Sequence, residues 1–328
     1  MRSDHVLLAR LDSVGDVLLT GPAVRAVAAG AARVTLLAGP RGRAAAELLP
    51  GVDRVLEWPA PWIEPDPGPV DPDQLNLLVK MVEDVDRALI FTSFHQSPLP
   101  LALLLRMARI PWIGAISVDY PGSLLDLRHQ VPDDIPEPER ALSLTTAAGY
   151  PPVGSSLSVR GPLPEPDLPS GYLVVHPGTS VPARAWPPGH CAALVELLTG
   201  HGHRVVVTGS PGERELTARV AGRHGIDLGG RTTLAELAGA LAGARVVVAG
   251  NTGPAHLAAA VGTPVVSLFA PTVPAVRWAP YGVRRRVLGD QRAACADTRA
   301  TVCPLLGHPC LSSVTPDQVH QAIMEVMR

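Results

Sequence analysis

Lysine, aromatic residues and long basic runs are scarce in this chain. Lys80 is the single lysine, and the formal net charge is −2. Without a long basic segment, nucleic acid is not expected as the main partner. Aromatic residues make up 4% and hydrophobic residues 46% of the chain, so the core is expected to be mostly aliphatic. The near absence of lysine beside abundant Ala, Gly and Pro is typical of a GC-rich genome.

A membrane-spanning run is also missing. The longest apolar window, residues 99–118, is interrupted by Arg106, Arg109 and Pro111, and each central Arg costs about 2.5–3.5 kcal/mol of insertion. The start of the chain has no cationic region followed by an apolar run and a small-residue cleavage site. A cytoplasmic protein is therefore favoured, with a peripheral membrane contact through this window left open.

Several cofactor and metal motifs are absent. No P-loop occurs, and the first glycine turn, SVGDVLLTG, has only Gly15 and Gly21, which disfavours a Rossmann dinucleotide site. Three cysteines and His308 near the C-terminus include no CxxC pair, so reduced thiols packing a loop are favoured over zinc. We expect no cofactor and no metal. The three cysteines are Cys295, Cys303 and Cys310.

Short apolar strands alternate with helical segments along the whole chain. This pattern predicts an α/β protein with parallel sheets, and 328 residues suit two domains. Residues 151–170 carry six prolines without periodicity and are predicted as a linker between domains 1–150 and 171–328. The predicted strands are 5–11, 33–38, 52–57, 87–92, 112–117, 172–175, 204–208, 226–228 and 245–249. The predicted helices are 17–30, 42–49, 75–85, 98–108, 187–199, 211–223, 233–242, 254–261 and 316–327.

The stretch 244–278 reads as a strand, a glycine-flanked turn, a Pro-started helix and a second strand. Its turn, GNTGPAH, aims free backbone N–H groups and a helix dipole at one point. Such a turn binds anions in many proteins and binds nothing in many others. Both interpretations stay open from this motif alone.

Other polar residues follow predicted strands. Asp16 follows the first strand and is either a general base or a first-turn acid that complements its helix dipole. HPGTSVPARAWP, from residue 176, contains Thr179, Ser180 and Arg184 and is either a diphosphate cradle or a capped loop. Glu213 is placed to meet a ribose diol or only its own helix dipole. His95 follows another strand and is either an acceptor contact or a surface histidine.

Taken together and in order, these segments resemble the heptosyltransferase family of inverting glycosyltransferases, which contains the ADP-heptose:lipopolysaccharide heptosyltransferases (glycosyltransferase family 9). The resemblance rests on SVGDVLLTGPAVRAV, HPGTSVPARAWP, GSPGERELT and GNTGPAHLAAAVGTPVVSLFAPT. It implies a GT-B fold, in which two Rossmann-like domains face each other across a cleft. The N-terminal domain would bind the acceptor, and the C-terminal domain a nucleotide-diphosphate sugar.

The resemblance also implies roles for individual residues. Asp16 would be the base that deprotonates the acceptor hydroxyl, with Gly15 and His95 on the acceptor side. The residues implied to hold the donor are Thr179, Ser180, Arg184, Glu213, Asn251, Thr252, Gly253 and His256.

Two residues depart from the pattern of the well-studied members. Arg184 stands where they carry Lys, and Asn251 stands where they carry Asp. Heptose or a related sugar, usually ADP-linked, is the expected donor group, and a glycan, a lipid-linked glycan or a small molecule the acceptor. A non-catalytic nucleotide-sugar-binding protein of the same fold is the alternative.

Overall fold

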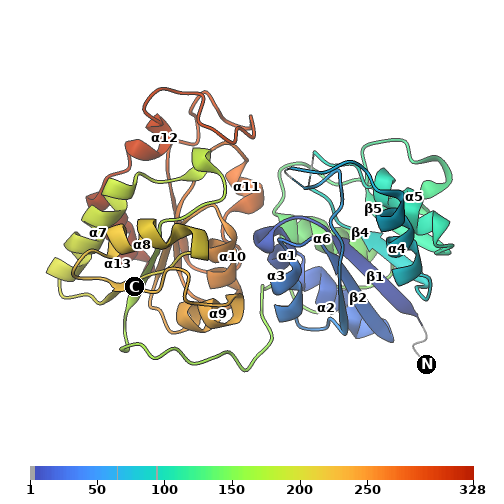
Figure 1. Cartoon of the computed structure of the whole chain (residues 1–328), viewed down its shortest axis with the longest axis horizontal. Coiled ribbons are helices and arrows are strands. Elements are labelled where there is room, and N and C mark those ends of the chain that lie inside the picture. The colour runs from blue at the N-terminus through green and yellow to red at the C-terminus, as the bar shows by residue number, and fades with distance from the viewer. Residues whose placement is uncertain (1–3, 65, 94) are drawn as a thin grey trace. The chain divides into compact units, whose positions relative to one another are not determined.

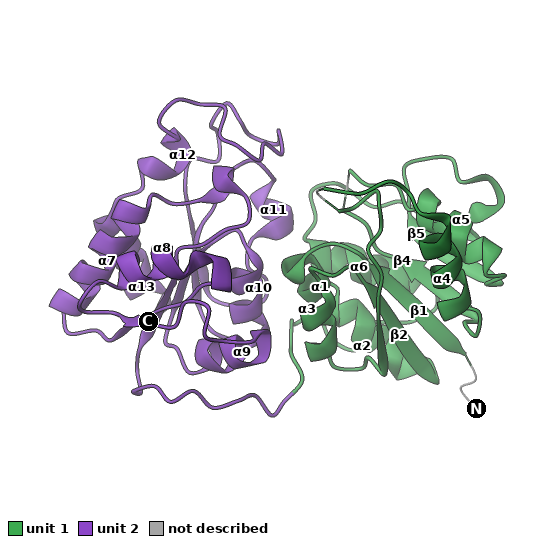
Figure 2. Cartoon of the chain, in the orientation of Figure 1, with its two compact units in different colours: residues 1–160 green, residues 161–328 purple. Residues whose placement is uncertain are grey.

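The computed structural model describes residues 4–64, 66–93 and 95–328. The chain divides into two compact units, residues 1–160 and residues 161–328 (Figure 2). The division falls inside the Pro-rich segment 151–170 that the sequence predicts as a linker.

Unit 1 is built around a parallel sheet with the strand order β3-β2-β1-β4-β5-β6. This is the Rossmann order, whose switch point lies between β1 and β4. Helices α1, α2 and α3 cover one face, and α4 and α5 cover the other (Figure 1). The strands are β1 (His5–Arg10), β2 (Arg33–Ala38), β3 (Arg54–Glu57), β4 (Arg87–Ile90), β5 (Trp112–Ile116) and β6 (Leu127–His129). The helices are α1 (Val14–Leu19), α2 (Gly21–Gly30), α3 (Arg43–Leu48), α4 (Pro72–Met81), α5 (Leu99–Met107) and α6 (Glu137–Ala147), with a 3₁₀ turn at Gly122–Leu124.

Strand β1 is buried along its whole length because it pairs with β2 on one side and β4 on the other. The segment after it forms two helices rather than the single helix predicted. Thr20 lies between α1 and α2, and Pro22 has no N–H with which to continue the first helix. The predicted turn at residues 13–16 is instead the N-cap of α1, Ser13, and the first turn of that helix.

Unit 2 repeats the same architecture with the order β12-β11-β10-β7-β8-β9, so its switch point lies between β7 and β10. Helices α7, α8 and α13 cover one face of this sheet, and α9 and α10 the other (Figure 1). The strands are β7 (Leu173–His176), β8 (Val205–Val207), β9 (Ile226–Asp227), β10 (Val247–Gly250), β11 (Val265–Leu268) and β12 (Arg285–Leu288). The helices are α7 (Pro188–Gly200), α8 (Arg214–Ala221), α9 (Leu234–Ala242), α10 (Gly253–Ala260), α11 (Ala275–Trp278), α12 (Pro309–Ser312) and α13 (Pro316–Val326), with 3₁₀ turns at Pro182–Arg184 and Pro211–Glu213.

Each unit contains its own core, built mainly from Val, Leu, Ile and Ala side chains as the composition predicts. The Pro-rich segment is tied down in both units. Arg25 donates to Ser158 Oγ at 2.7 Å, and Arg160 donates to the carbonyl oxygen of Val52 at 2.6 Å within unit 1. Within unit 2, the Pro164 carbonyl packs directly against the Cα of Gly239 in α9.

The expected α/β class with two Rossmann-like units is confirmed. Five elements were not predicted from the sequence, namely α6, β6, α11, β12 and α12. Of these, α11 lies at the end of the stretch 244–278, and the others lie in segments without a predicted element. Among residues 4–64, 66–93 and 95–328, no helix combines the length and the apolar character needed to cross a membrane.

Candidate active site

The carboxyl ends of β1 and β4 carry a network of charged side chains. Arg10, the last residue of β1, is 3% exposed. Its Nη2 lies 2.9 Å from Asp16 Oδ1 and donates to Ser93 Oγ at 3.0 Å. The second oxygen of Asp16 accepts a hydrogen bond from Ser13 Oγ at 2.9 Å. Asp16 therefore points toward this network, and both of its carboxylate oxygens accept hydrogen bonds.

A second carboxylate shares the same guanidinium. Asp12 Oδ2 lies 2.9 Å from Arg10 Nε, and Asp12 Oδ1 accepts from Gln96 Nε2 at 2.5 Å. Burial raises the pKa of Asp12, Arg10 acts against that rise, and the charge of Asp16 adds to it. Burial alone would lower the pKa of Arg10, but Asp12, Asp16 and Glu137 together raise it above its usual value. The cluster therefore keeps the guanidinium charged.

Two further site residues, Glu137 and Arg140, belong to α6, a helix that was not predicted from the sequence. Glu137 Oε2 lies 4.0 Å from Arg10 Nη1, and Arg140 Nε lies 3.3 Å from Glu137 Oε1. Both side chains are 5% exposed and line one pocket together with Arg10 and Asp16. The signal was available in the sequence, because EPER places two acids and a proline in the first turn before an apolar periodic run.

The two residues expected on the acceptor side differ in setting. Gly15 is buried inside α1, one residue before Asp16. His95 is exposed in the loop after β4, and the side chain of this loop that reaches Asp12 is that of Gln96. Both acceptor-side roles stay predictions.

In unit 2, one pocket lies at the carboxyl ends of β7 and β10. It is bounded by His176, the last residue of β7, by Gly178 and Arg184 from the segment after it, and by Gly250, the last residue of β10. Thr179 Oγ1 is engaged locally, since it accepts from the Val181 N–H at 3.2 Å. Ser180 is exposed. The pocket therefore unites two motifs that lie far apart in the sequence.

Glu213, which follows β8, contacts a residue of this pocket but does not line it. Its Oε2 accepts from the backbone N–H and the hydroxyl of Ser210, at 2.7 and 2.8 Å, which forms a capping box. The same carboxylate packs against the Cα of Gly178. Burial lowers the pKa of His176 to about 4, and Glu213 acts in the opposite direction. The His176 imidazole is therefore neutral near pH 7 and bonds Thr208 Oγ1 through Nδ1 at 3.0 Å.

The turn between β10 and α10 holds the remaining predicted donor residues. Thr252 is the N-cap of α10, Gly253 begins the helix, and His256 is 4% exposed within it. Asn251 is also 4% exposed. Neither Oδ1 nor Nδ2 of its amide has a hydrogen-bond partner among the residues that the structure describes. A buried amide left without partners costs the fold about 1–3 kcal/mol.

The C-terminal cysteines are free thiols. Cys295 and Cys310 are buried and Cys303 is partly buried, and burial together with the neighbouring thiols raises the pKa of Cys310 to about 11. In the part of the chain that the structure describes, no three His, Cys, Asp or Glu side chains are placed to hold a metal ion.

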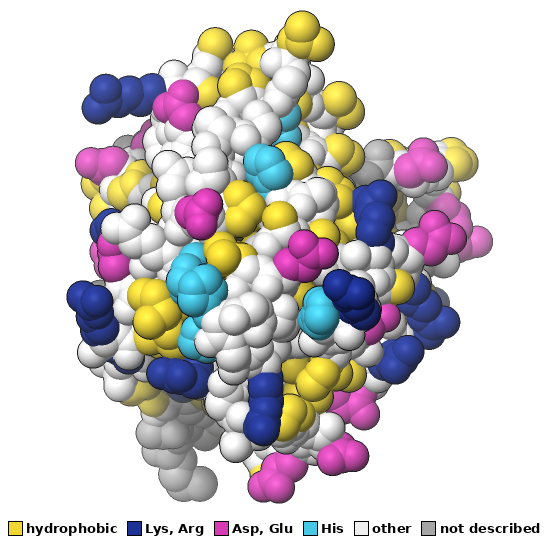
Figure 3. Space-filling view, turned by 90° about the vertical axis from the view of Figure 1, so that its left-hand side faces the viewer, with side chains coloured by type: hydrophobic (Ala, Val, Ile, Leu, Met, Phe, Trp, Pro, Cys, Tyr) yellow, Lys and Arg dark blue, Asp and Glu magenta, His cyan; other side chains and the backbone are white. Residues whose placement is uncertain are grey.

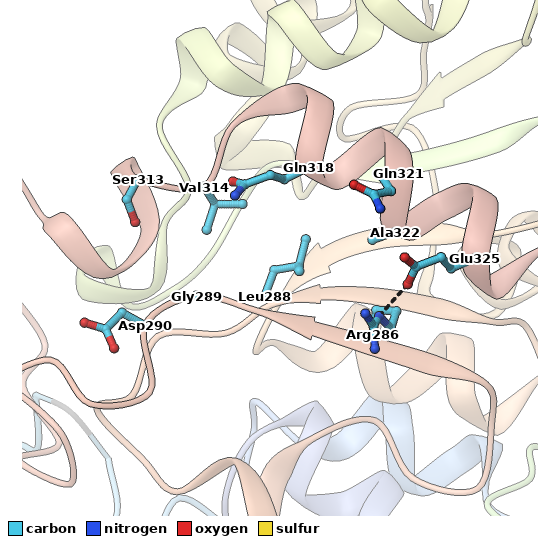
Figure 4. Close-up of a pocket in the computed structure, with 10 residues that line it drawn as sticks. All are labelled: Arg286, Leu288, Gly289, Asp290, Ser313, Val314, Gln318, Gln321, Ala322 and Glu325. Atoms are coloured by element: carbon cyan, nitrogen blue, oxygen red, sulfur yellow. Dashed lines mark ion pairs between the residues drawn. The ribbon is translucent and has the colours of Figure 1, made fainter.

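Two surface features lie outside the predicted site. Histidine side chains gather on one face of the molecule (Figure 3). The rings of His201 and His320 lie 4.7 Å apart. An open groove runs between β12 and α13, where Arg286 and Glu325 pair at 2.7 Å (Figure 4). None of the predicted site residues lines this groove.

Both units thus place polar and charged side chains at the switch point of a Rossmann-like sheet, where open α/β sheets bind ligands. The model of glycosyltransferase family 9 (heptosyltransferase) matches residues 124–307, more than half of the chain. The chain belongs to glycosyltransferase family 9.

Individual relatives agree with this assignment. Lipopolysaccharide heptosyltransferase 1 of Pseudomonas aeruginosa is 38% identical over 146 residues, which are 44% of this chain and 41% of that protein. The chain thus matches about two-fifths of the length of this curated relative.

Solved structures match over the whole fold. The glycosyl transferase family 9 structure from Veillonella parvula has a TM-score of 0.79 at 16% identity, and the match covers 99% of this chain and 97% of the Veillonella chain. Escherichia coli ADP-heptose lps heptosyltransferase II has a TM-score of 0.75 at 19% identity and covers 100% and 98%. These matches confirm the GT-B fold class expected from the resemblance.

Proposed function

We propose that the protein is an inverting glycosyltransferase that moves a sugar from an ADP-linked donor to a hydroxyl group of a glycan or a small molecule. The observation that carries the proposal is the Asp16 carboxylate, which is held by Arg10 and Ser13 at the switch point of unit 1 in a chain of this family. A carboxylate oriented in this way is suited to general-base catalysis.

In the proposed reaction, Asp16 accepts the proton of the acceptor hydroxyl. The hydroxyl oxygen then forms a bond to the anomeric carbon of the donor as the bond from that carbon to the diphosphate oxygen breaks. Attack from the opposite side inverts the anomeric configuration. Arg184 and the N-terminus of α10 stabilise the negative charge that develops on the departing ADP. Thr179, Ser180, Thr252, Gly253 and His256 complete the phosphate side of the donor site.

Glu213 and Asn251 are proposed to determine the specificity for the donor. Glu213 accepts hydrogen bonds from the ribose diol. Asn251 contacts the transferred sugar, because a sugar hydroxyl both donates and accepts and so satisfies both unpartnered amide atoms. The name of the E. coli structure identifies ADP-heptose as a substrate of that protein. Heptose or a related sugar is the donor group proposed for this chain.

The test is ADP release from ADP-heptose in the presence of a glycan fraction from cell extract. Wild-type protein is expected to release ADP with inversion, and Asp16→Ala to lose the activity by about 10²–10⁴-fold. If Asp16→Ala retains turnover, Asp16 is not the catalytic base.

The second candidate is a nucleotide-sugar-binding protein without transfer activity. It is favoured by Asn251, an amide at the position where the resemblance implies a carboxylate. Calorimetry separates the two functions, since tight ADP binding without transfer to any acceptor supports the binding protein.

The proposal includes a cytoplasmic location with a peripheral contact at the inner face of the membrane. Leu103 and Met107 project from one side of α5 and are 52% and 54% exposed. Flotation with anionic vesicles tests this contact, and Leu103→Ser with Met107→Ser is expected to weaken it.

A further inference from the structure

Arg10 belongs to a closed ring of contacts among four residues at the carboxyl ends of β1 and β4, in which Ser93 takes part through both its hydroxyl and its backbone N–H. Its Nη2 donates to Ser93 Oγ, the Ser93 N–H donates to Gln96 Oε1 at 3.0 Å, and Gln96 Nε2 donates to Asp12 Oδ1. An ion pair between Asp12 and Arg10 Nε closes the ring at 2.9 Å. Besides its contact with Asp16, the Arg10 guanidinium is therefore held by Asp12 at Nε and by Ser93 at Nη2.

One contact of this ring reaches the proposed base. The Nη2 group that bonds Ser93 also pairs with Asp16 Oδ1 at 2.9 Å. Ser13 Oγ bonds the other oxygen. Because a guanidinium is planar and rigid, fixing its Nε edge on Asp12 also fixes the direction of Nη2. The position of the Asp16 carboxylate is thus set by residues that do not line the pocket, among them Asp12 and Gln96.

The charges of the cluster also require Arg10. Asp12, Asp16 and Glu137 surround Arg10, and the three carboxylates would repel one another without it. Asp12 is too enclosed to accept the proton of a large acceptor, since its side chain is 11% exposed against 19% for Asp16. Asp16 also lines the pocket, whereas Asp12 does not.

We propose that Arg10 is a positioning residue, which aims the Asp16 carboxylate at the acceptor hydroxyl through a ring closed by Asp12, Gln96 and Ser93. The inference rests on the proposed function of Asp16 as the base. Arg10 acts through the direction and the ionisation of Asp16.

A double-mutant cycle in the full chain tests this role. Arg10→Lys keeps the charge but loses the planar fork. It is expected to lower kcat for ADP release from ADP-heptose by ~10²-fold, as misplacement of a reacting group does. The KM for the donor stays within about threefold, because donor binding does not involve Asp16. In an Asp16→Ala background, Arg10→Lys is expected to have no further effect on kcat. Equal losses in both backgrounds would overturn the proposal, since they indicate a structural role.

Arg87→Lys is the matched control. Arg87 also lies in the sheet of unit 1 and donates to the Tyr150 hydroxyl and the Ala148 carbonyl, both at 3.1 Å. It begins β4, at the edge opposite to Asp16. Its replacement by Lys is expected to lower the melting temperature and to leave kcat unchanged.

A second readout does not need turnover. With ¹³Cγ-labelled aspartate, the Asp16 signal is assigned by its loss in Asp16→Asn. Arg10→Gln is expected to move the titration midpoint of that signal upward, because a cation in contact with the carboxylate is removed. Arg87→Gln is expected to leave the titration midpoint of the Asp16 signal unchanged. If wild-type protein releases no ADP but the Asp16 midpoint moves in Arg10→Gln, the proposed function fails, whereas the influence of Arg10 on Asp16 is supported. An unmoved midpoint overturns the positioning role itself.

Discussion

The carboxylate of Glu213 packs so closely against Gly178 that a β-carbon at position 178 would overlap it. The two residues follow β8 and β7, which are neighbouring strands of the unit 2 sheet. A side chain at position 178 would therefore displace the Glu213 carboxylate, which is the far end of a flexible side chain, whereas the backbone at Gly178 has no unusual conformation. The contact places the acid that is proposed to bind the ribose against the loop that is proposed to bind the diphosphate.

Gly178→Ala is accordingly expected to weaken ADP binding by about tenfold, because the added methyl group displaces the Glu213 carboxylate. It should lower the stability of unit 2 only slightly, because that carboxylate is the end of a flexible side chain. Calorimetry with ADP and urea unfolding measure the two effects. Gly189→Ala is the control, because nothing lies within 4 Å of an added β-carbon there. It is expected to be neutral or stabilising. Normal ADP affinity in Gly178→Ala would show that Glu213 is not part of the donor site.

Asn251→Leu is expected to stabilise the ligand-free protein, because it removes two buried polar atoms that have no partners among the described residues. The melting temperature should rise by ~2–4 °C. The extra stabilisation by ADP-heptose over ADP should be lost in the same variant. Asn251→Asp is the matched control, and it should lower the melting temperature because it buries an unpaired charge. A drop in melting temperature for Asn251→Leu contradicts the prediction.

Acid conditions are expected to destabilise unit 2 through His176. Its folded-state pKa is about 4, below the ordinary value of 6.5. The unfolded chain therefore takes up a proton on this imidazole as the pH falls below 6.5, whereas the folded chain does so only near pH 4. Stability is full above pH 6.5 and falls by up to about 1.4 kcal/mol per pH unit below it.

Urea unfolding between pH 4 and 7 measures this slope. His176→Asn removes the titrating ring and keeps a polar atom for Thr208, so its slope should be shallower than that of the wild type. Identical slopes would show that His176 is not the group responsible.

Gly239→Ala is expected to destabilise unit 2 although it lies within α9. Alanine normally favours a helix over glycine by ~1 kcal/mol, but here its β-carbon would overlap the Pro164 carbonyl. The ADP affinity should be unchanged, because α9 does not line the donor pocket. Gly200→Ala, at the end of α7 with nothing within 4 Å, should not destabilise the protein. A stabilising effect of Gly239→Ala would mean that the Pro-rich segment is free to move away.

Much of the fold was predictable because each sheet is parallel and buried, so its strands are short apolar runs between glycine and proline signals. The predicted β2, residues 33–38, coincides with the observed strand. The elements that were missed have weaker patterns. Strand β6 has three residues, and β12 begins with two exposed arginines. Helix α6 begins in a proline-rich segment that hides its periodicity.

The site was predictable where single residues follow strands, as Asp16 and Asn251 do. It was not predictable where the function of a residue depends on long-range contact. Arg10 reads in the sequence as the end of an apolar strand, and nothing local shows that three carboxylates surround it. Glu137 comes from a helix more than a hundred residues later, so only the folded chain brings it to Arg10.

The ring of Arg10, Asp12, Gln96 and Ser93 also has a consequence for the order of folding. Gln96 and Asp12 are 84 residues apart, and the ring closes only after β4 has paired with β1. Contacts of such large sequence separation form late. A nascent chain that ends before residue 93 already contains Asp16 together with Arg10 and Ser13, but it lacks Ser93 and Gln96, so the ring that holds Arg10 cannot yet close.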